Sequence, residues 1–228
     1  MLIRVMITRA DIPRTGEGIA FVHGEIQPEV AQMAGNRGFT MAVDHSSGRY
    51  ICIAAWADDE AVKANADRAA GLISDIARRL GGSEPSVEIF DLAVAHSVKP
   101  LRVGYWGRLT RVNLTVDDLD RAVPRFRDTA PAFFEHYDGL AAINLFVNRR
   151  SGVAESVLWF DSLHILRGST SRYEEVQKLL AADIPAVKIV EAAELEVVIA
   201  ETGSPEAAPL MPPREASDVS SNAGRRER

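Results

Sequence analysis

The sequence predicts an α+β fold made of two related modules, each of about 100 residues with its strands and helices in the order βαββαβ. Two observations predict this fold. Short sequence matches recur in the same order in both halves of the chain. The hydrophobic periodicity also changes from a strand pattern to a helix pattern at corresponding places in each half.

The internal repeat is carried by four matches that keep their order. They pair Leu2–Val5 with Pro100–Val103, Ser47–Gly48 with Ser151–Gly152, Trp56 with Trp159, and Pro85–Ile89 with Pro185–Ile189. Several ordered matches separated by a nearly constant interval indicate a duplicated unit. We therefore divide the chain into modules at 1–98 and 99–201.

The periodicity predicts the same elements in both modules. The opening strands are expected at 2–9 and 101–109, the first helices at 17–34 and 117–136, the hairpin strands of the first module at 39–43 and 50–56, the second helices at 58–80 and 169–182, and the last strands at 86–95 and 187–200. In the second module the hairpin flanks residues 148–152. Thr115 or Asp117 can cap the helix that follows, and Gly81-Gly82 can end the second helix of the first module. Pro28 and Pro124 are expected to break a helix or to begin a new one.

This order gives each module a four-stranded antiparallel sheet in a ferredoxin-like arrangement, with two helices on one face. The other face needs a cover, so we expect the modules to pack sheet to sheet. The alternation places an apolar set beneath the helices: Phe39, Met41 and Val43, and then Ile143, Leu145 and Val147. A mixed set faces the other way: Thr40, Ala42 and Asp44, and then Asn144, Phe146 and Asn148. The mixed face is where a pocket is expected.

Composition excludes several classes of partner. The formal net charge of −6 disfavours nucleic acid and anionic membranes. The lone Cys52 cannot form an internal disulfide, and neither a signal peptide nor an apolar run of roughly 20 residues is visible, so we expect a cytoplasmic protein that is not embedded in a membrane. A monomer and a homodimer both remain open. Residues 202–228 are rich in Gly, Ser, Pro, Ala and charged residues, and we expect a disordered tail there.

The chain resembles the dimeric α+β barrel superfamily, and in particular proteins like the antibiotic biosynthesis monooxygenases. The resemblance rests on the βαββαβ order, the hairpin, and a strand that ends in Trp before acidic residues, as in residues 55–61, with Trp159-Phe160-Asp161 as a second version. It implies a tandem-fused barrel in which small ligands bind between each sheet and its helices. It also implies a range of activities that includes cofactor-independent oxygenases, haem-degrading enzymes and proteins without known activity.

No cofactor and no metal is expected. The haem-degrading members would place an Asn on the first strand and a His on the second helix. Thr8 and Trp106 stand near the two Asn positions, residues 58–80 contain no His, and His164 precedes the second helix of its module. The five histidines show neither HxH nor HExxH spacing, so a metal site is not predicted.

Two polar residues are candidates for catalysis. Glu155 shares a strand face with Trp159, so its carboxylate could be buried, raised in pKa and used as a base. Asn144 could orient a substrate oxygen. Each residue also has a purely structural alternative. Glu155 would then be a solvent-exposed carboxylate on a strand, and Asn144 an amide that is hydrogen-bonded to the backbone. The expected pocket-lining residues are Trp56, Trp159, Trp106, Phe146 and Thr40.

Two functions remain open from the sequence. The first is a cofactor-independent, monooxygenase-like enzyme that acts on a small, largely apolar organic molecule. The alternative is a non-catalytic protein that binds a small ligand or another protein, for example in a stress or nutrient response. Corresponding polar positions share no chemistry in the two modules, which favours a single, asymmetric site in the second half.

Overall fold

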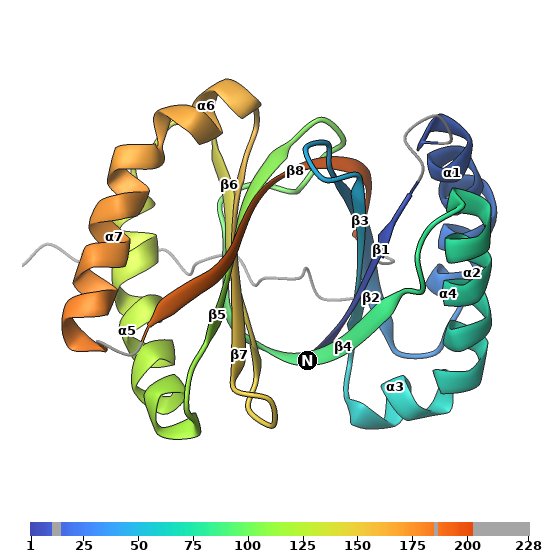
Figure 1. Ribbon diagram of the computed structural model, residues 1–228, viewed down its shortest axis with the longest axis horizontal. Coiled ribbons are helices and arrows are strands. Elements are labelled where there is room, and N and C mark those ends of the chain that lie inside the picture. Colours follow the sequence, from blue (N-terminus) through green and yellow to red (C-terminus); the bar gives the residue numbers. More distant parts are fainter. Residues whose placement is uncertain (11–14, 185–186, 203–228) are drawn as a thin grey trace, which may run out of the picture.

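A computed structural model describes residues 1–10, 15–184 and 187–202, and its strands form one closed barrel with helices on two opposite sides (Figure 1). The first half contains β1 (Leu2–Arg9), α1 (Thr15–Phe21), a π-helical segment η2 (Val22–Ile26), α2 (Gln27–Ala31), β2 (Asn36–Asp44), β3 (Arg49–Trp56), α3 (Asp59–Ala64), α4 (Ala66–Leu80) and β4 (Ser86–Ser97). The second half contains β5 (Trp106–Asn113), α5 (Val116–Phe134), β6 (Leu140–Asn148), β7 (Val153–Phe160), α6 (Leu163–Gly168), α7 (Thr170–Asp183) and β8 (Lys188–Thr202).

The strand order confirms two ferredoxin-like sheets packed face to face. Around the barrel it is β1-β3-β2-β8-β5-β7-β6-β4, and the paired strands are antiparallel. The last strand of each half pairs within its own sheet and also with the other sheet: β4 pairs with β1 and β6, and β8 with β5 and β2. The division at residues 98 and 99 stays a proposal, because β4 and β8 belong to both sheets by pairing.

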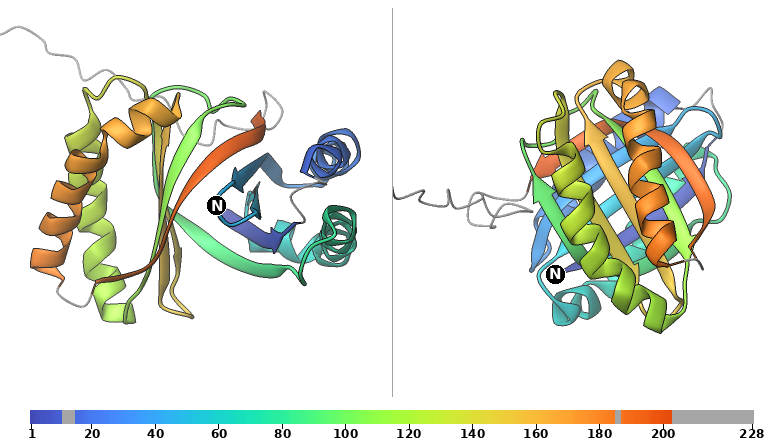
Figure 2. Two further views of the ribbon diagram at one scale, coloured as in Figure 1. Left: turned by 45° about the horizontal axis from the view of Figure 1, so that its top comes forward. Right: turned by 90° about the vertical axis from the view of Figure 1, so that its left-hand side faces the viewer.

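Side chains alternate between the barrel interior and two helix layers, as the strand period requires. One apolar cluster fills the barrel and includes Ile3, Val5, Val157 and Trp159. A second cluster lies between the first sheet and α1–α4, and a third between the second sheet and α5–α7. The apolar sets predicted from β2 and β6 lie beneath the helices, as expected. The two helix layers lie far apart, with the barrel between them (Figure 2).

Local capping explains where several helices begin and end. The side chains of Asp58, Thr115 and Ser162 accept hydrogen bonds from backbone amides three residues later, at 2.8, 3.1 and 3.3 Å. Such caps satisfy amides that have no partner within the helix. Gly81 ends α4 with a positive φ of 65°, the left-handed conformation that favours glycine. Thr115 and Gly81 thus have the roles that the sequence predicts.

Two predictions about local structure were wrong. Pro28 does open α2, but Pro124 lies inside α5, because the apolar face of that helix is held against the sheet and packing overrides the local break. The opening strand of the second half spans Trp106–Asn113 rather than 101–109. The match at residues 100–103 was out of register, because Arg108 is the counterpart of Arg4. Arg4 donates Nη2 to the backbone oxygen of Val62, and Arg108 donates Nη2 to the backbone oxygen of Leu166.

The same register corrects a second match. The amide of Ala57 donates to Gly35 O and the amide of Asp161 to Gly139 O, so the two halves are 104 residues apart at these positions. Phe160, not Trp159, is therefore the counterpart of Trp56. The predicted tail lies outside the described residues except for Thr202, which ends β8. In the described part of the chain, no helix is long and apolar enough to cross a membrane.

Candidate functional site

A cavity of about 150 Å³ lies in the second half, between the outer face of the sheet and the helices α5 and α7. Most of its wall is apolar. Leu119, Val123 and Phe126 come from α5, and Val176 and Leu180 from α7. The apolar periods of the two helices point these side chains at the sheet. A cavity of about 150 Å³ lined by apolar residues holds one benzene-sized ring.

The polar groups of this cavity lie close together. Thr110 comes from β5, Ser156 from β7, and Tyr173 and Gln177 from α7. The hydroxyls of Thr110 and Tyr173 are hydrogen-bonded to each other. Burial raises the pKa of Tyr173, against hydrogen bonding with Thr110 and Gln177, so the phenol stays protonated near neutral pH. The cavity thus offers hydroxyls and an amide that can hold one oxygen atom of a ligand.

Arg108 packs against the ring of Tyr173 and holds it in place. Its guanidinium carbon lies 5.2 Å from the centre of the tyrosine ring. Its Nη2 donates to Leu166 O at 2.9 Å and to Thr170 Oγ1 at 3.0 Å. An arginine held at this distance from an aromatic ring orients it by a cation–π interaction. The position of the Tyr173 hydroxyl is therefore set by packing that does not involve a ligand.

The corresponding layer of the first half is almost filled, with a cavity of only about 40 Å³. Met6 and Cys52 stand at the positions of Thr110 and Ser156, which replaces both hydroxyls. Tyr50, which is fully buried, stands at the position of Ala154. Larger side chains therefore close the space that the second half leaves open, and the two halves are not equivalent as binding sites.

Glu155 lies in the barrel interior, on the opposite face of the sheet from the cavity. Its side chain is 2% exposed and its Oε1 accepts from Arg111 Nη1 at 2.5 Å. Arg111 Nη2 also pairs with Glu88 at 2.6 Å, so this arginine joins the two sheets. Burial raises the pKa of Glu155 to about 7, in spite of the charge of Arg111.

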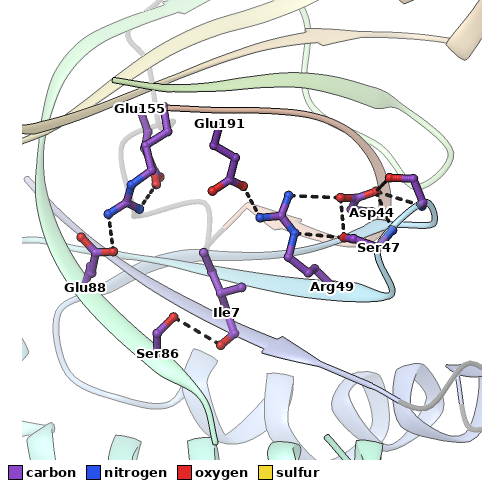
Figure 3. Close-up of polar contacts among 10 residues, drawn as sticks. Ile7, Asp44, Ser47, Arg49, Ser86, Glu88, Glu155 and Glu191 are labelled. Carbon is purple, nitrogen blue, oxygen red and sulfur yellow. Dashed lines mark hydrogen bonds and ion pairs between the residues drawn. The ribbon is translucent and has the colours of Figure 1, made fainter. Parts of the chain in front are cut away.

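A second ion-paired arginine crosses the same part of the barrel. Arg49 pairs with Glu191 of the other sheet, and its Nη2 lies 3.1 Å from Asp44 Oδ2. Figure 3 shows Glu155, Glu88 and Glu191 converging in this region from three strands. These contacts connect the sheets electrostatically, and they lie apart from the 150 Å³ cavity.

The other predicted site residues divide between three places. Asn144 accepts a hydrogen bond from Trp159 Nε1 at 3.1 Å in the barrel, and this bond satisfies the indole. Phe146 packs in the barrel against Phe90, with ring centres 6.5 Å apart. Thr40 also lies on a barrel-facing strand position, buried opposite Ile53.

Trp56 and Trp106 lie outside the barrel. Trp56 packs under the helices of the first half and lines the 40 Å³ cavity. Trp106 is half-buried beside His45, with ring centres 5.9 Å apart. None of the seven predicted site residues lines the 150 Å³ cavity, and the structure does not bring Glu155 together with Trp56 or Trp106.

The sequence did not predict the polar residues of the larger cavity, because they lie among apolar residues whose pattern indicates buried core. Thr110 and Ser156 interrupt apolar strand positions that face the helices, and Tyr173 lies on the face of α7 that packs on the sheet. One polar residue on such a face is usually satisfied by a neighbour. A signal was nevertheless present. Met6 and Cys52 replace two of the polar residues in the other half, which a repeat aligned at 104 residues would have shown. In the described part of the chain, no three His, Cys, Asp or Glu side chains form a group that could hold a metal ion.

Comparison with other proteins gives sequence relatives and structural neighbours. No protein-family model matches the chain. The chain is 30% identical over 190 residues to the uncharacterized Mycobacterium tuberculosis protein Rv2558, and the alignment covers 83% of this chain and 80% of the relative. It is 32% identical over 145 residues to Rv2557 of the same organism, with 64% of each chain covered.

Solved structures with the same fold include proteins related to monooxygenases. FN1347 of Fusobacterium nucleatum, a candidate monooxygenase, superposes with a TM-score of 0.70 at 12% identity, over 88% of this chain and 94% of that one. An anthrone oxidase-like protein gives 0.62 at 15% identity, over 94% and 96%. At these identities the likeness shows the fold, which is the tandem α+β barrel of proteins like the antibiotic biosynthesis monooxygenases.

Proposed function

We propose that this chain, which belongs to the family of the Mycobacterium tuberculosis protein Rv2558, binds one small aromatic molecule in the cavity of its second half. One observation carries the proposal: the cavity of about 150 Å³ has an apolar wall with a cluster of hydroxyl groups at one place in it. The ligand class that fits is a single ring with one hydroxyl or carbonyl oxygen, such as a phenol.

The apolar wall supplies the affinity and the polar groups supply the orientation. Moving an apolar ring out of water stabilises the complex by about 25 cal/mol for each Å² of apolar surface that is buried. The ligand oxygen can accept from the Tyr173 hydroxyl or donate to the hydroxyls of Thr110 and Ser156. A ligand without an oxygen atom would make no hydrogen bond with these hydroxyls and would bind less tightly.

Binding fits this cavity better than oxidation does. A cofactor-independent oxygenase needs a group that removes a proton from its substrate. Among the described lining residues the polar groups are hydroxyls and one amide, and the raised pKa of Tyr173 keeps its phenol from acting as a base near neutral pH. Glu155, which does have a pKa near neutrality, faces the barrel and not the cavity.

Calorimetric titration with phenol and with benzene tests the proposal. The wild type is expected to bind both, with phenol tighter. Ala154→Phe fills the cavity with a ring where the first half carries Tyr50, and it should abolish binding of both ligands. Tyr173→Phe should weaken phenol about fivefold, which corresponds to about 1 kcal/mol for one hydrogen bond, and leave benzene unchanged.

Tyr50→Phe is the matched control, because it makes the same chemical change in the filled layer of the first half. It should leave both affinities unchanged. Failure of the wild type to bind either ligand at millimolar concentration would refute the proposal. Equal effects of the two tyrosine variants would refute the role of Tyr173.

Monooxygenase-like oxidation is the second candidate, and the fold of the neighbours FN1347 and the anthrone oxidase-like protein favours it. Oxygen uptake in the presence of quinol-like substrates tests it directly. Uptake that depends on the protein and disappears in Ala154→Phe would favour oxidation over binding alone. Absence of turnover by the wild type would remove the oxygenase proposal and leave the binding proposal to its own titration.

A further inference from the structure

The polar groups of the 150 Å³ cavity are gathered at one end of it, which we call the inner end. Thr110, Ser156 and Tyr173 form this end, and only 5%, 8% and 8% of their surfaces are exposed. Thr110 and Ser156 are direct partners across β5 and β7, and the hydroxyl of Tyr173 is hydrogen-bonded to that of Thr110. The inner end is therefore both polar and closed to solvent.

The opposite end of the cavity, its outer end, is apolar and open. Val112 and Leu114 follow Thr110 on the same side of the chain, because side chains alternate along a strand. Val112 is paired with Ile189 of β8, which lines the cavity although 47% of its surface is exposed. Val187, which also lines this end, is half-buried. The outer end thus meets solvent where β8 begins beside the end of α7 (Figure 1).

The distance between the two ends exceeds the size of one ring. From Thr110 to Leu114 the chain advances by four residues, or about 13 Å at about 3.3 Å for each strand residue. On the helix side, Tyr173 and Ile184 both line the cavity and are about 16 Å apart at about 1.5 Å for each helix residue. A phenol ring held by its hydroxyl at Tyr173 covers the inner part of this length. Its para position then points along the apolar lining toward the outer end.

The first half closes the corresponding end with hydrogen bonds. Thr8 is the counterpart of Val112, and its hydroxyl donates to Ser83 O at 2.9 Å. The amide of Ser83 donates in turn to Arg9 O at 3.1 Å, so the segment after α4 is tied to β1. Val112 has no hydroxyl and cannot make the same bond. An open apolar end is therefore particular to the second half.

We propose that the ligand of this site is a phenol that carries a linear alkyl chain para to its hydroxyl, bound with the hydroxyl at the inner end and the chain leaving past Ile189. The proposal rests on the ring-binding function proposed above and adds the class and the orientation of the ligand. The buried hydroxyls receive the only polar group of such a ligand, and the chain covers exposed apolar surface. The reverse orientation would place the ligand hydroxyl against Val187 and Ile189, where the side chains offer it no hydrogen-bond partner.

Calorimetric titration with a series of phenols tests the proposal on the wild type. The series is phenol, para-ethylphenol, para-propylphenol and para-pentylphenol. The Kd is expected to fall about fourfold for each added methylene group that the protein buries, and to level off once further carbons lie beyond Ile189. Ortho-propylphenol is the matched control ligand, because it has the same composition but places its chain beside the buried hydroxyls. It should gain nothing over phenol.

Ile189→Ser tests the path of the chain. It removes apolar surface at the outer end and should weaken para-propylphenol about fourfold while leaving phenol unchanged. Val190→Ser is the matched control, because Val190 is the next residue of β8, is 52% exposed and stands outside the cavity lining. It should change neither affinity. Tyr173→Phe should weaken every para-alkylphenol by the same factor as phenol, since the hydroxyl is held at one place throughout the series.

The outcomes separate this inference from the function on which it rests. If neither phenol nor its alkyl derivatives bind the wild type, the ring-binding function and this inference fall together. If phenol binds and para chains bring no gain, or ortho-propylphenol gains as much as para-propylphenol, the inference alone is overturned. Equal effects of Ile189→Ser and Val190→Ser on para-propylphenol would also overturn it.

Discussion

The buried carboxylate of Glu155 should make the stability of the barrel depend on pH, and Glu155→Gln removes that dependence. Glu155 is 2% exposed in the interior and faces Arg111, with the carboxylates of Glu88 and Glu191 close enough to raise its pKa further. The glutamine variant keeps the size of the side chain and loses the titration. Arg111 keeps its other partner, Glu88, in the variant.

The magnitude follows from the pKa in the folded and unfolded states. Burial raises the pKa of Glu155 to about 7, from its ordinary value of 4.5. Between these two values the folded state binds more protons than the unfolded state, so stability falls as pH rises. The stabilising contribution is fully present below pH 4.5 and is lost as pH rises through 7. The total change is about 3 kcal/mol, since one pKa unit corresponds to about 1.4 kcal/mol.

Urea denaturation at a series of pH values from 4 to 8 measures this effect. The free energy of unfolding of Glu155→Gln minus that of the wild type should increase by about 3 kcal/mol across the series. Glu88→Gln is the control, because it leaves Glu155 in place and should keep most of the pH dependence of the wild type. Parallel pH profiles for the wild type and Glu155→Gln would refute the reasoning.

Three further predictions concern packing, a buried carboxylate and the thiol. Gly107→Ala should destabilise the protein by about 1–3 kcal/mol in urea, because its Cβ would lie 2.6 Å from ring atoms of Trp159; wild-type stability would contradict this. Burial raises the pKa of Asp44, but hydrogen bonds from Ser46, Ser47 and Arg49 outweigh it and lower the pKa to about 2. Asp44→Asn should therefore cost about 2 kcal/mol above pH 4, and the loss should fade as pH falls through 2; a loss that is constant with pH would count against it. Cys52 should resist thiol reagents at pH 8 in the native protein and react after unfolding; rapid native labelling would disprove its burial.

Local pattern and turn chemistry in the sequence determined much of the fold. The alternation of Phe39, Met41 and Val43 placed one strand face beneath the helices, and the structure has it there. Capping by Thr115 and the glycine stop at Gly81 were readable because these effects act within a few residues. The fused, sheet-to-sheet arrangement followed from a sheet with one uncovered face.

The site was decided by tertiary structure. Whether a helix-facing layer is filled depends on side-chain volumes that meet from different elements, such as Tyr50 in one half against Ala154 in the other. Of the four sequence matches only Ser47–Gly48 with Ser151–Gly152 has the 104-residue offset, and the equivalent strand pairing within each sheet is what selects it. The sequence by itself determined which side chains alternate and where helices start. Only the tertiary structure decided which buried donors, such as Arg4 Nη1, remain without a partner, because hydrogen-bond satisfaction is a property of neighbours in space.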